Sequence, residues 1–405
     1  MPKRIPFFLY LFSLTGLLFG GELAEQSGSQ DLPGYTTTAA NNFFQRFDGY
    51  LAYMHQFGSV YGEGRGGQEV HHDAEEIRRF WVGAKGDFLD VFGFSVVSQI
   101  SRDRHNFPGE ERQFGHETFR SANVTFRAHE ALSPADFDSL TFGYGRRSGR
   151  MADEWQRSAT HIETVERSAF ANKLWLSDKE RGNPLAVWVK SRINKSTIDL
   201  AVFSGTYHDW MGGWEDSRTY YASYEQDLSA TTGLETTDLW LSTYYQDEEA
   251  GDDRLAGGNQ YVFAFVTRWA DGPWSFHTTL GTGDNGKQTN TARSGDFWGA
   301  VLMPMYWLVE EKQKLVFRYQ YQSATEAEGI RMNNRYARMA ASRDTLIDIN
   351  SSRGDEHHSL YFGYNYYFRG DNLKLVSGIQ WDQLFSEGDS YFRGWTFSTA
   401  LRFLL

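Results

Sequence analysis

Apolar and polar side chains alternate with a period of two along most of this chain. The clearest example is a pair of segments, Leu360–Phe368 and Leu373–Trp381, separated by the turn Arg369–Asn372. Every second residue of the first segment is leucine, phenylalanine or tyrosine, whereas the opposite positions include Asn365 and a glycine. Because a β-strand turns successive side chains to opposite faces, the pattern predicts a hairpin with one face suited to lipid and the other to water.

Segments with this alternation continue to the last residue and number about sixteen, an even number inside the range of outer-membrane barrels. The predicted strands are Arg46–Gln56, Glu76–Phe88, Phe92–Arg102, Phe119–Arg127, Leu140–Arg147, Leu185–Asn194, Ile198–Gly205, Tyr220–Leu228, Thr237–Gln246, Tyr261–Trp269, Trp274–Gly281, Phe297–Leu308, Leu315–Gln322, Leu360–Phe368, Leu373–Trp381 and Trp395–Leu405. The predicted fold class is therefore all-β, a transmembrane antiparallel β-barrel.

The links between the predicted strands alternate between short and long. The short links are Phe88–Val91, Glu130–Asp138, Lys195–Thr197, Ser229–Gly233, Ala270–Pro273, Glu310–Lys314 and Arg369–Asn372. The long links are Phe57–Ala74, Asp103–Gly115, Ser148–Pro184, Thr206–Thr219, Asp247–Gln260, Thr282–Asp296, Ser323–His358 and Phe385–Gly394. Membrane barrels have short periplasmic turns and long outer loops, and both ends of the predicted barrel fall on the short-turn side.

The third long link, Ser148–Pro184, is too long for a hairpin turn and too rich in charge to form a core. A long polar loop between membrane strands commonly carries function. We expect it to fold into the pore and narrow it, with Arg167 reaching the ion path. The alternative is that Arg167 pairs with Glu166 or another loop carboxylate and only holds the shape of the loop.

The N-terminus has the features of a secretory signal. Lys3 and Arg4 precede the apolar run Ile5–Phe19, and Gly20 and Gly21 follow it. The run is shorter than the roughly 20 residues of a transmembrane helix, which favours a signal peptide. We therefore expect a signal peptide at residues 1–21, with an uncertain cleavage site, a flexible segment at 22–42, and the barrel at 43–405.

Composition supports a barrel exported to the outer membrane of a Gram-negative-type bacterium. Aromatic residues make up 16% of the chain, and there are 40 glycines, 8 prolines and no cysteine. Aromatic girdles are expected of such barrels, and the missing cysteines exclude disulfides and thiolate metal sites. The mean hydropathy of −0.55 excludes a helical membrane protein, and the net charge of −12 argues against a nucleic-acid partner.

The parity of each strand predicts which charged side chains face the lumen. The predicted lumen cations are Arg79, Lys85, Arg127, Arg147, Lys190, Arg192, Arg268, Arg318, Lys374 and Arg402, and the predicted lumen anions are Asp48, Asp87, Asp199, Asp238 and Asp382. Rings of arginine or lysine select anions, so the excess of cations favours an anion path. The alternative is that these cations pair with neighbouring carboxylates or meet lipopolysaccharide at the rim, and a single bulge reverses the parity of a strand.

Other candidate chemistry in the sequence is weak. His71, His72 and Asp73 have the residue types of a metal site, but a solvated loop is the simpler interpretation. The acidic pairs Asp153-Glu154 and Glu163–Glu166 resemble catalytic carboxylates, but a structural role in the loop is favoured. No serine-hydrolase, zinc-protease or P-loop spacing occurs. We therefore expect no enzyme activity, no cofactor and no metal.

Three segments resemble the phosphate-selective porin O and P family. Glu76–Phe88 is similar to that family's early basic strand, with Trp81 where its third basic residue stands, and Leu140–Arg146 is similar to its L-T-V-G strand. Thr160–Asn172 resembles its E-R-S stretch through Glu166, Arg167 and Ser168. The three segments follow in the family's order along the first half of the chain.

The resemblance implies a sixteen-stranded porin, usually a homotrimer in outer-membrane lipid, with the third long loop folded inward. It also implies uptake of phosphate or other small anions, and by position it makes Arg79, Arg146 and Arg167 the corresponding basic residues. Two alternatives stay open. One is a general or sugar-type diffusion porin, for which inward Trp81, Trp188, Trp240 and Tyr244 would stack on the solute, and the other is a closed structural barrel or a barrel enzyme.

Overall fold

The computed structural model describes residues 43–132, 136–176, 183–204, 214, 218–247 and 259–405. The expected signal peptide and flexible segment, residues 1–42, lie outside this part and stay predictions. Parts of four expected links also lie outside it, namely residues 133–135, 177–182, 206–213 with 215–217, and 248–258.

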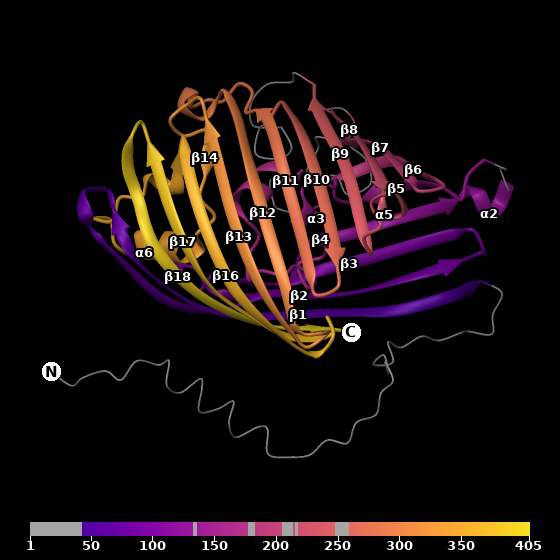
Figure 1. Ribbon diagram of the computed structural model, residues 1–405, viewed down its shortest axis with the longest axis horizontal. Helices are drawn as coiled ribbons and strands as arrows, with labels where there is room; N and C mark the ends of the chain where they lie inside the picture. Colours follow the sequence, from indigo (N-terminus) through magenta and orange to yellow (C-terminus); the bar gives the residue numbers. More distant parts are fainter. Residues whose placement is uncertain (1–42, 133–135, 177–182, 205–213, 215–217, 248–258) are drawn as a thin grey trace, which may run out of the picture. The chain divides into compact units, whose positions relative to one another are not determined.

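Sixteen strands form one closed antiparallel barrel. Each strand pairs with the next barrel strand along the chain, and β1 pairs with β18 to close the wall (Figure 1). The barrel strands are β1 (Phe44–Gly64), β2 (Glu69–Phe88), β3 (Phe92–Asp103), β4 (Arg112–Arg127), β5 (Ser139–Arg146), β6 (Leu185–Ile193), β7 (Ser196–Ser204), β8 (Arg218–Asp227), β9 (Thr236–Gln246), β10 (Tyr261–Asp271), β11 (Trp274–Asp284), β12 (Asp296–Val309), β13 (Gln313–Ala324), β16 (Glu356–Arg369), β17 (Leu373–Ser386) and β18 (Asp389–Leu404). The predicted fold class and the existence of all the predicted strands are confirmed.

The alternation in the sequence becomes the two faces of the wall. Phe362 and Trp395 face outward and are each 52% exposed, whereas Asn365 and Arg402 face inward and are fully buried. An apolar outer face and a polar inner face are what a bilayer requires of a barrel wall. The architecture is that of an outer-membrane barrel, which agrees with the expected location.

Among the described residues, no helix is long and apolar enough to cross a membrane.

The predicted alternation of short and long links holds from β5 to β17, but two of the expected long loops, at β1–β2 and β17–β18, are wrong. Residues 57–74 and 385–394 mostly continue the flanking strands, so that only residues 65–68 and 387–388 connect them. The strands continue because their inner faces stay apolar; Val60, for example, is fully buried. Short helices in the connections are η1 (Arg65–Gly67), α2 (Ala128–Leu132), α5 (Ser229–Thr232) and η4 (Thr291–Arg293).

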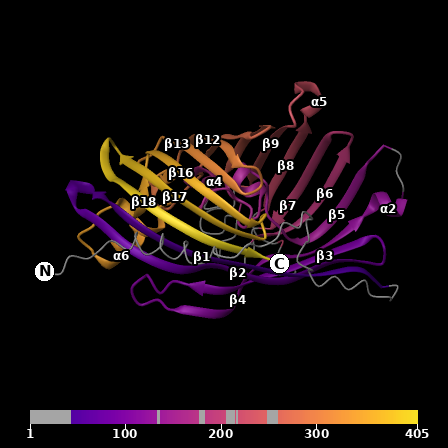
Figure 2. The same cartoon turned by 60° about the horizontal axis from the view of Figure 1, so that its bottom comes forward.

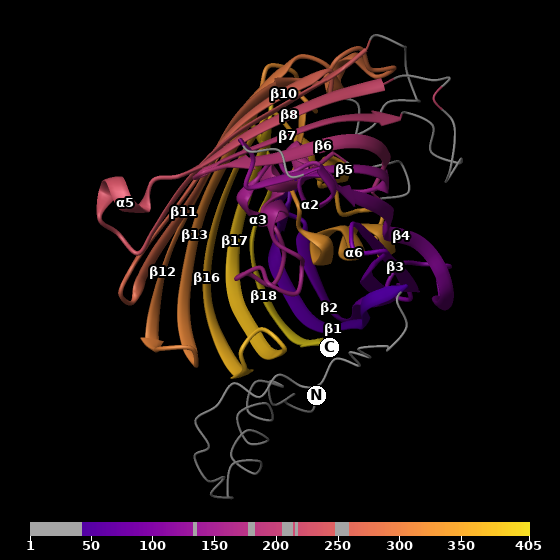
Figure 3. The ribbon, with the colours of Figure 1, turned by 90° about the vertical axis from the view of Figure 1, so that its right-hand side faces the viewer.

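Two long connections fold into the barrel. The link between β5 and β6 carries α3 (Asp153–Gln156) and α4 (Ala169–Leu174), as the sequence predicts for the third long loop. The link between β13 and β16 carries β14 (Ile330–Arg331), α6 (Arg335–Arg343), η5 (Asn350–Ser352) and β15 (Arg353–Gly354), and its inward course is not predicted. Figure 2 shows α4, and Figure 3 shows α3 and α6, within the ring of barrel strands.

Candidate pore constriction

The loop between β5 and β6, called the inward loop below, crosses the lumen and contacts the wall on several sides. Asp153 in α3 pairs with Arg268 of β10 and with His277 of β11. Farther along, Glu163 accepts a hydrogen bond of 3.0 Å from Lys314 of β13. Further hydrogen bonds reach β16 and β18. The inward loop therefore spans the lumen from one side of the wall to the other.

An apolar cluster holds the inward loop against strands β6 to β12. Its loop members are Met151, Ala152, Trp155, Phe170, Ala171, Leu174 and Leu176, and the wall members include Trp188, Phe203, Tyr221, Tyr244, Val262 and Phe297. The Phe170 ring lies over two glycines, because a Cβ at Gly281 or Gly299 would stand 3.1 or 2.7 Å from it. Burying apolar surface is worth about 25 cal/mol per Å², so this cluster stabilises the inward position of the loop.

Carboxylates of the inward loop pair with cations of the wall. Glu154 and Arg318 are joined at 2.7 Å, and their side chains are only 3% and 2% exposed. Burial acts to raise the pKa of Glu163, but the charges of Lys314 and Lys374 outweigh it and hold that pKa well below its usual value. Two arginines of β2 lower the pKa of Glu166 in the same way. Glu163 and Glu166 therefore stay ionised at ordinary pH, so their pairs with the wall persist.

Arg167 lies inside the inward loop. Its guanidinium donates to the carbonyl oxygens of Glu154 at 2.7 Å and Arg157 at 3.0 Å, and it stacks on the Trp155 ring at 3.8 Å. The residue is 4% exposed. This geometry favours the alternative in which Arg167 holds the shape of the loop, although Glu166 turns away from it to pair with Arg78. Its role in the ion path stays a prediction.

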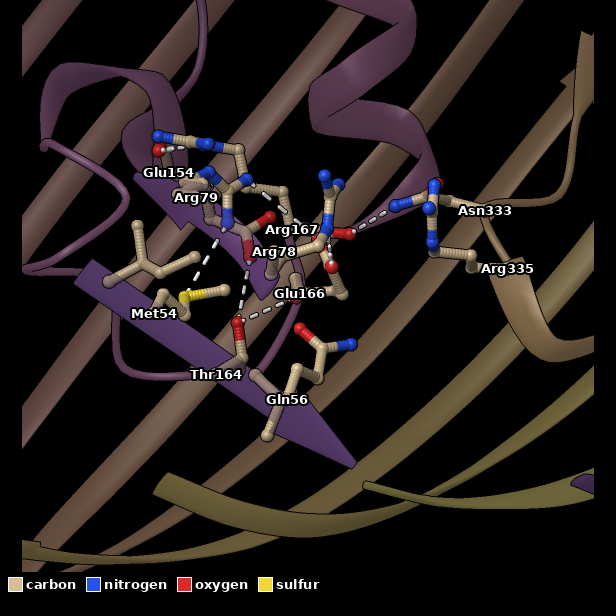
Figure 4. A network of polar contacts seen from close by, with 12 residues as sticks. Met54, Gln56, Arg78, Arg79, Glu154, Thr164, Glu166, Arg167, Asn333 and Arg335 are labelled. Atoms are coloured by element: carbon tan, nitrogen blue, oxygen red, sulfur yellow. Dashed lines mark hydrogen bonds and ion pairs between the residues drawn. The ribbon is translucent and has the colours of Figure 1, made fainter. Parts of the chain in front are cut away.

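A group of charged side chains gathers where the inward loop meets β2 (Figure 4). Glu166 is bonded to Arg78 and lies 3.9 Å from a guanidinium nitrogen of Arg79. The side chains of Arg78, Arg79 and Glu166 are 28%, 12% and 18% exposed. Arg335 of α6 reaches the same place and pairs with Glu76 of β2 at 2.5 Å. We call these five residues the constriction cluster.

A tryptophan of β2 lies between two guanidinium groups next to the constriction cluster. Arg79 and Arg120 approach the ring of Trp81 at 5.9 and 4.9 Å. Arg120 sits at a bulge, because Val97 of β3 pairs with Ser121 while Ser98 pairs with Phe119. A bulge re-aims side chains, and parity alone does not predict Arg120 as a lumen residue.

Some of the other predicted cations bind groups of the inward loop or of the wall, and the rest lie nearer the ends of the barrel. Arg147 pairs with Asp199, Arg146 donates to the carbonyl of Asn183, Arg402 donates to carbonyl oxygens of the inward loop, Lys374 is buried beside Asp371, Arg127 pairs with Asp87, Lys85 lies on the Tyr50 ring, Lys190 is partly buried and Arg192 is exposed. Most of these cations hold protein groups together, as the alternative interpretation expects. Their role in an ion path stays a prediction.

The residues considered for other chemistry have ordinary partners. His71, His72 and Asp73 lie on β2 rather than in a loop, and His71 is 3.6 Å from Asp73. Within the described part of the chain, no group of three or more His, Asp or Glu side chains is arranged to hold a metal ion. The acidic pairs of the inward loop are engaged with wall cations, as described above.

Lys173 fastens the outer end of α4 to two connections of the wall. Its ammonium group donates to the side-chain oxygens of Asn259, at 3.0 Å, and Asn285, and lies 4.4 Å from the centre of the Phe297 ring. Burial lowers the pKa of Lys173 to about 7, with a smaller contribution from the charge of Arg353. A positive charge held by neutral oxygens and an aromatic ring is costly to bury.

We expect the attachment of α4 to strengthen as pH rises from about 7 to 10. A lysine released into water keeps a pKa near 10.4, so in this interval the detached state binds more protons than the attached state, and attachment gains free energy with pH. Proteolysis of the inward loop should accordingly be faster at pH 6.5 than at pH 9. In Lys173→Met the difference should vanish, and a rate that increases with pH in the parent barrel would contradict the assignment.

Comparisons with known proteins agree on the fold. The outer-membrane channel DcaP of Acinetobacter baumannii matches with 9% identity and a TM-score of 0.53, over 89% of this chain and 97% of that one. OprB of Pseudomonas putida matches with 11% identity and a TM-score of 0.54, over 89% of this chain and 94% of that one. An anion-selective porin from Comamonas acidovorans matches with 8% identity and a TM-score of 0.52, over 89% of this chain and 99% of that one. At these identities the likeness shows the porin fold alone. Neither family models nor curated sequences match this chain.

Proposed function

We propose that this barrel is an outer-membrane channel for passive diffusion of small solutes and that it prefers anions such as phosphate. The observation that carries the proposal is the excess of positive charge at the constriction. In the constriction cluster three guanidinium groups, those of Arg78, Arg79 and Arg335, face two carboxylates, those of Glu76 and Glu166, an excess of one positive charge. The guanidinium groups of Arg167 and Arg402 lie near enough to act on Arg79 as well.

Arg79 is the residue of this group best placed to meet a solute. Its nearest carboxylate, on Glu166, is 3.9 Å away and is shared with Arg78. The charges of Arg78, Arg167 and Arg402 all act on Arg79. By contrast, Arg167 and Arg402 donate to backbone carbonyl oxygens, which carry no net charge. An anion passing Arg79 would therefore lower the repulsion among these guanidinium groups.

The sugar-type alternative receives less support from the inward aromatic side chains. Their inward position is as predicted, but the rings are covered. Arg79 and Arg120 lie at the Trp81 ring, Arg147 at Trp188 and Arg268 at Trp240. Rings that already carry a guanidinium offer little surface for a sugar. The fold of the anion-selective Comamonas porin is compatible with the proposal, and assembly into a trimer stays a prediction.

The test is the reversal potential of the purified barrel in planar bilayers under a potassium chloride gradient. We expect the unmodified protein to prefer chloride, and Arg79→Glu to lower the ratio of chloride to potassium permeability by about fivefold, since a charge in a narrow passage acts strongly on ions. Arg79→Lys, which keeps the charge, and Arg192→Glu, at an exposed strand end, should change the ratio little. Cation preference in the unmodified protein would refute the proposal.

A further inference from the structure

A second segment fills the outer part of the lumen, opposite the apolar cluster of the inward loop. Residues 332–352, called the strap below, hang from the two-stranded stem formed by β14 and β15. The apolar side chains of the strap pack on the inner faces of β1, β2, β17 and β18. They are Met332, Tyr336, Ala337, Met339, Ala340 and Ile349, in contact with Val60, Val70, Leu384 and Phe392. The inner surface of the barrel wall therefore holds the strap inside the lumen.

Polar contacts fix the beginning of α6 to the same strands. Asn334 caps the helix and donates to Asp382 at 3.0 Å and to Thr396 at 2.8 Å. The ring of Tyr336 occupies the space over Gly58, where a Cβ would be 2.2 Å from it. The barrel wall therefore has a shaped seat for the strap.

The strap also joins the constriction cluster, as Figure 4 shows. Asn333 donates to the carbonyl of Arg167 in the inward loop at 2.9 Å. Arg335 pairs with Glu76, whose side chain is 1% exposed. The strap and the inward loop therefore meet on β2.

Two features of the strap are energetically costly. Asn350, Ser351 and Ser352 have φ values of 46°, 53° and 62°, and three successive non-glycine residues in the left-handed region are costly. Within the described structure, the buried atoms Nε of Arg335 and Oγ of Ser352 have no hydrogen-bond partner. Residues 350–352 are therefore the part of the strap where a change of backbone conformation would cost least.

We propose that the strap is a gate for the outer mouth of the channel, which opens by turning about Asn350–Ser352 and closes on the Arg335–Glu76 pair. The proposal rests on the proposed channel function. The strap is compact and has a seat, a strained hinge and one buried ion pair at the constriction. Release of that pair allows α6 to leave β1 and β2 while the inward loop stays attached to β6–β12.

The first experiment removes the strap without disturbing the wall. Arg331 and Arg353 are paired residues of the stem, and Met332 donates to the carbonyl of Ser352 at 2.8 Å. An Asn-Gly turn in place of residues 332–352 should therefore close the stem as a short hairpin. We expect single-channel conductance to rise by at least about twofold, because a wider mouth passes more ions. An unchanged conductance in a heat-modifiable, folded barrel would overturn the proposal.

The second experiment follows the position of the gate with single introduced cysteines. The chain has no cysteine of its own, so each introduced thiol is the one that the reagent labels. Ala340→Cys, on the buried face of α6 at 3% exposure, should react slowly with a membrane-impermeant thiol reagent, and Leu346→Cys, at 76%, rapidly. Adding Arg335→Ala should accelerate Ala340→Cys by about tenfold or more, because it leaves Glu76 buried without its partner. Ala171→Cys in the inward loop should stay slow.

An unaltered rate at Ala340→Cys when Arg335 is replaced would refute the gate. Conductance and labelling rates test the strap, whereas reversal potentials test anion preference. A barrel that opens when the strap is removed but prefers cations would therefore refute the proposed selectivity and leave the gate standing.

Discussion

Arg318→Ala should release the inward loop from the wall and open the lumen. The guanidinium of Arg318 donates to the Glu154 carboxylate at 2.7 Å, to the Thr164 hydroxyl at 3.1 Å and to the Glu166 carbonyl at 2.9 Å. The contacts with Glu154 and Thr164 are buried, and removing one member of a buried ion pair costs about 3–5 kcal/mol because the other charge keeps no counter-ion. The Glu154 carboxylate would retain its hydrogen bonds from Ser168 and Thr164.

The expected result is a several-fold rise in conductance together with rapid proteolysis within residues 148–176. The matched control is the double variant Arg318→Met with Glu154→Gln, which removes both charges and keeps much of the volume. Because a buried ion pair can be replaced by uncharged groups at little cost, this control should behave more like the parent barrel. Equal opening in both variants would show that the pair does not hold the loop.

The strands of the barrel wall are predictable from the sequence because the pattern that defines each strand lies within the strand itself. Each strand has a period of two, and each short turn follows within a few residues. The predicted strands are too short mainly at their outer ends, where Val60 and Leu384 continue the inward apolar face beyond the expected boundary. Those residues face a segment that is distant in sequence. A strand boundary that depends on such a partner cannot be drawn from the strand alone.

The inward loop is predictable by length and charge, but its partners are not. Which wall cation meets Glu154 or Glu163 depends on where a loop of irregular backbone crosses the lumen. Parity also fails at Arg120, where the bulge between β3 and β4 changes the direction of one side chain. The sequence therefore predicts a surplus of inward cations better than it predicts which cation stands at the constriction.

The strap does leave a signal in the sequence that could have been used. Met332, Tyr336 and Met339 are spaced by four and three residues, which is the spacing of one helix face. Asn334 precedes the helix as a capping residue. An apolar helix face inside an outer loop indicates a segment that packs on something, and inside a barrel the inner wall is the surface available to it.

Phe170→Ala should weaken the attachment of the inward loop at its apolar end, independently of its ion pairs. Phe170 is fully buried, and its ring fills the hollow left by Gly281 and Gly299 on β11 and β12. Truncation of a buried phenylalanine costs about 3–5 kcal/mol through lost transfer energy and the cavity that remains. We expect faster proteolysis near α4 and a higher conductance, with the strap still seated and Ala340→Cys still slow to react.

Phe170→Leu provides the matched control, because it keeps an apolar side chain in the hollow and should cost less. Gly299→Ala tests the same contact from the wall. Its Cβ would stand 2.7 Å from the Phe170 ring, so this substitution should also loosen the loop. Since Phe170→Ala leaves space for that methyl group, the two substitutions together should cost less than the sum of their separate effects. A fully additive result would mean that the ring does not occupy the hollow, and the apolar attachment of the loop would have to be placed elsewhere.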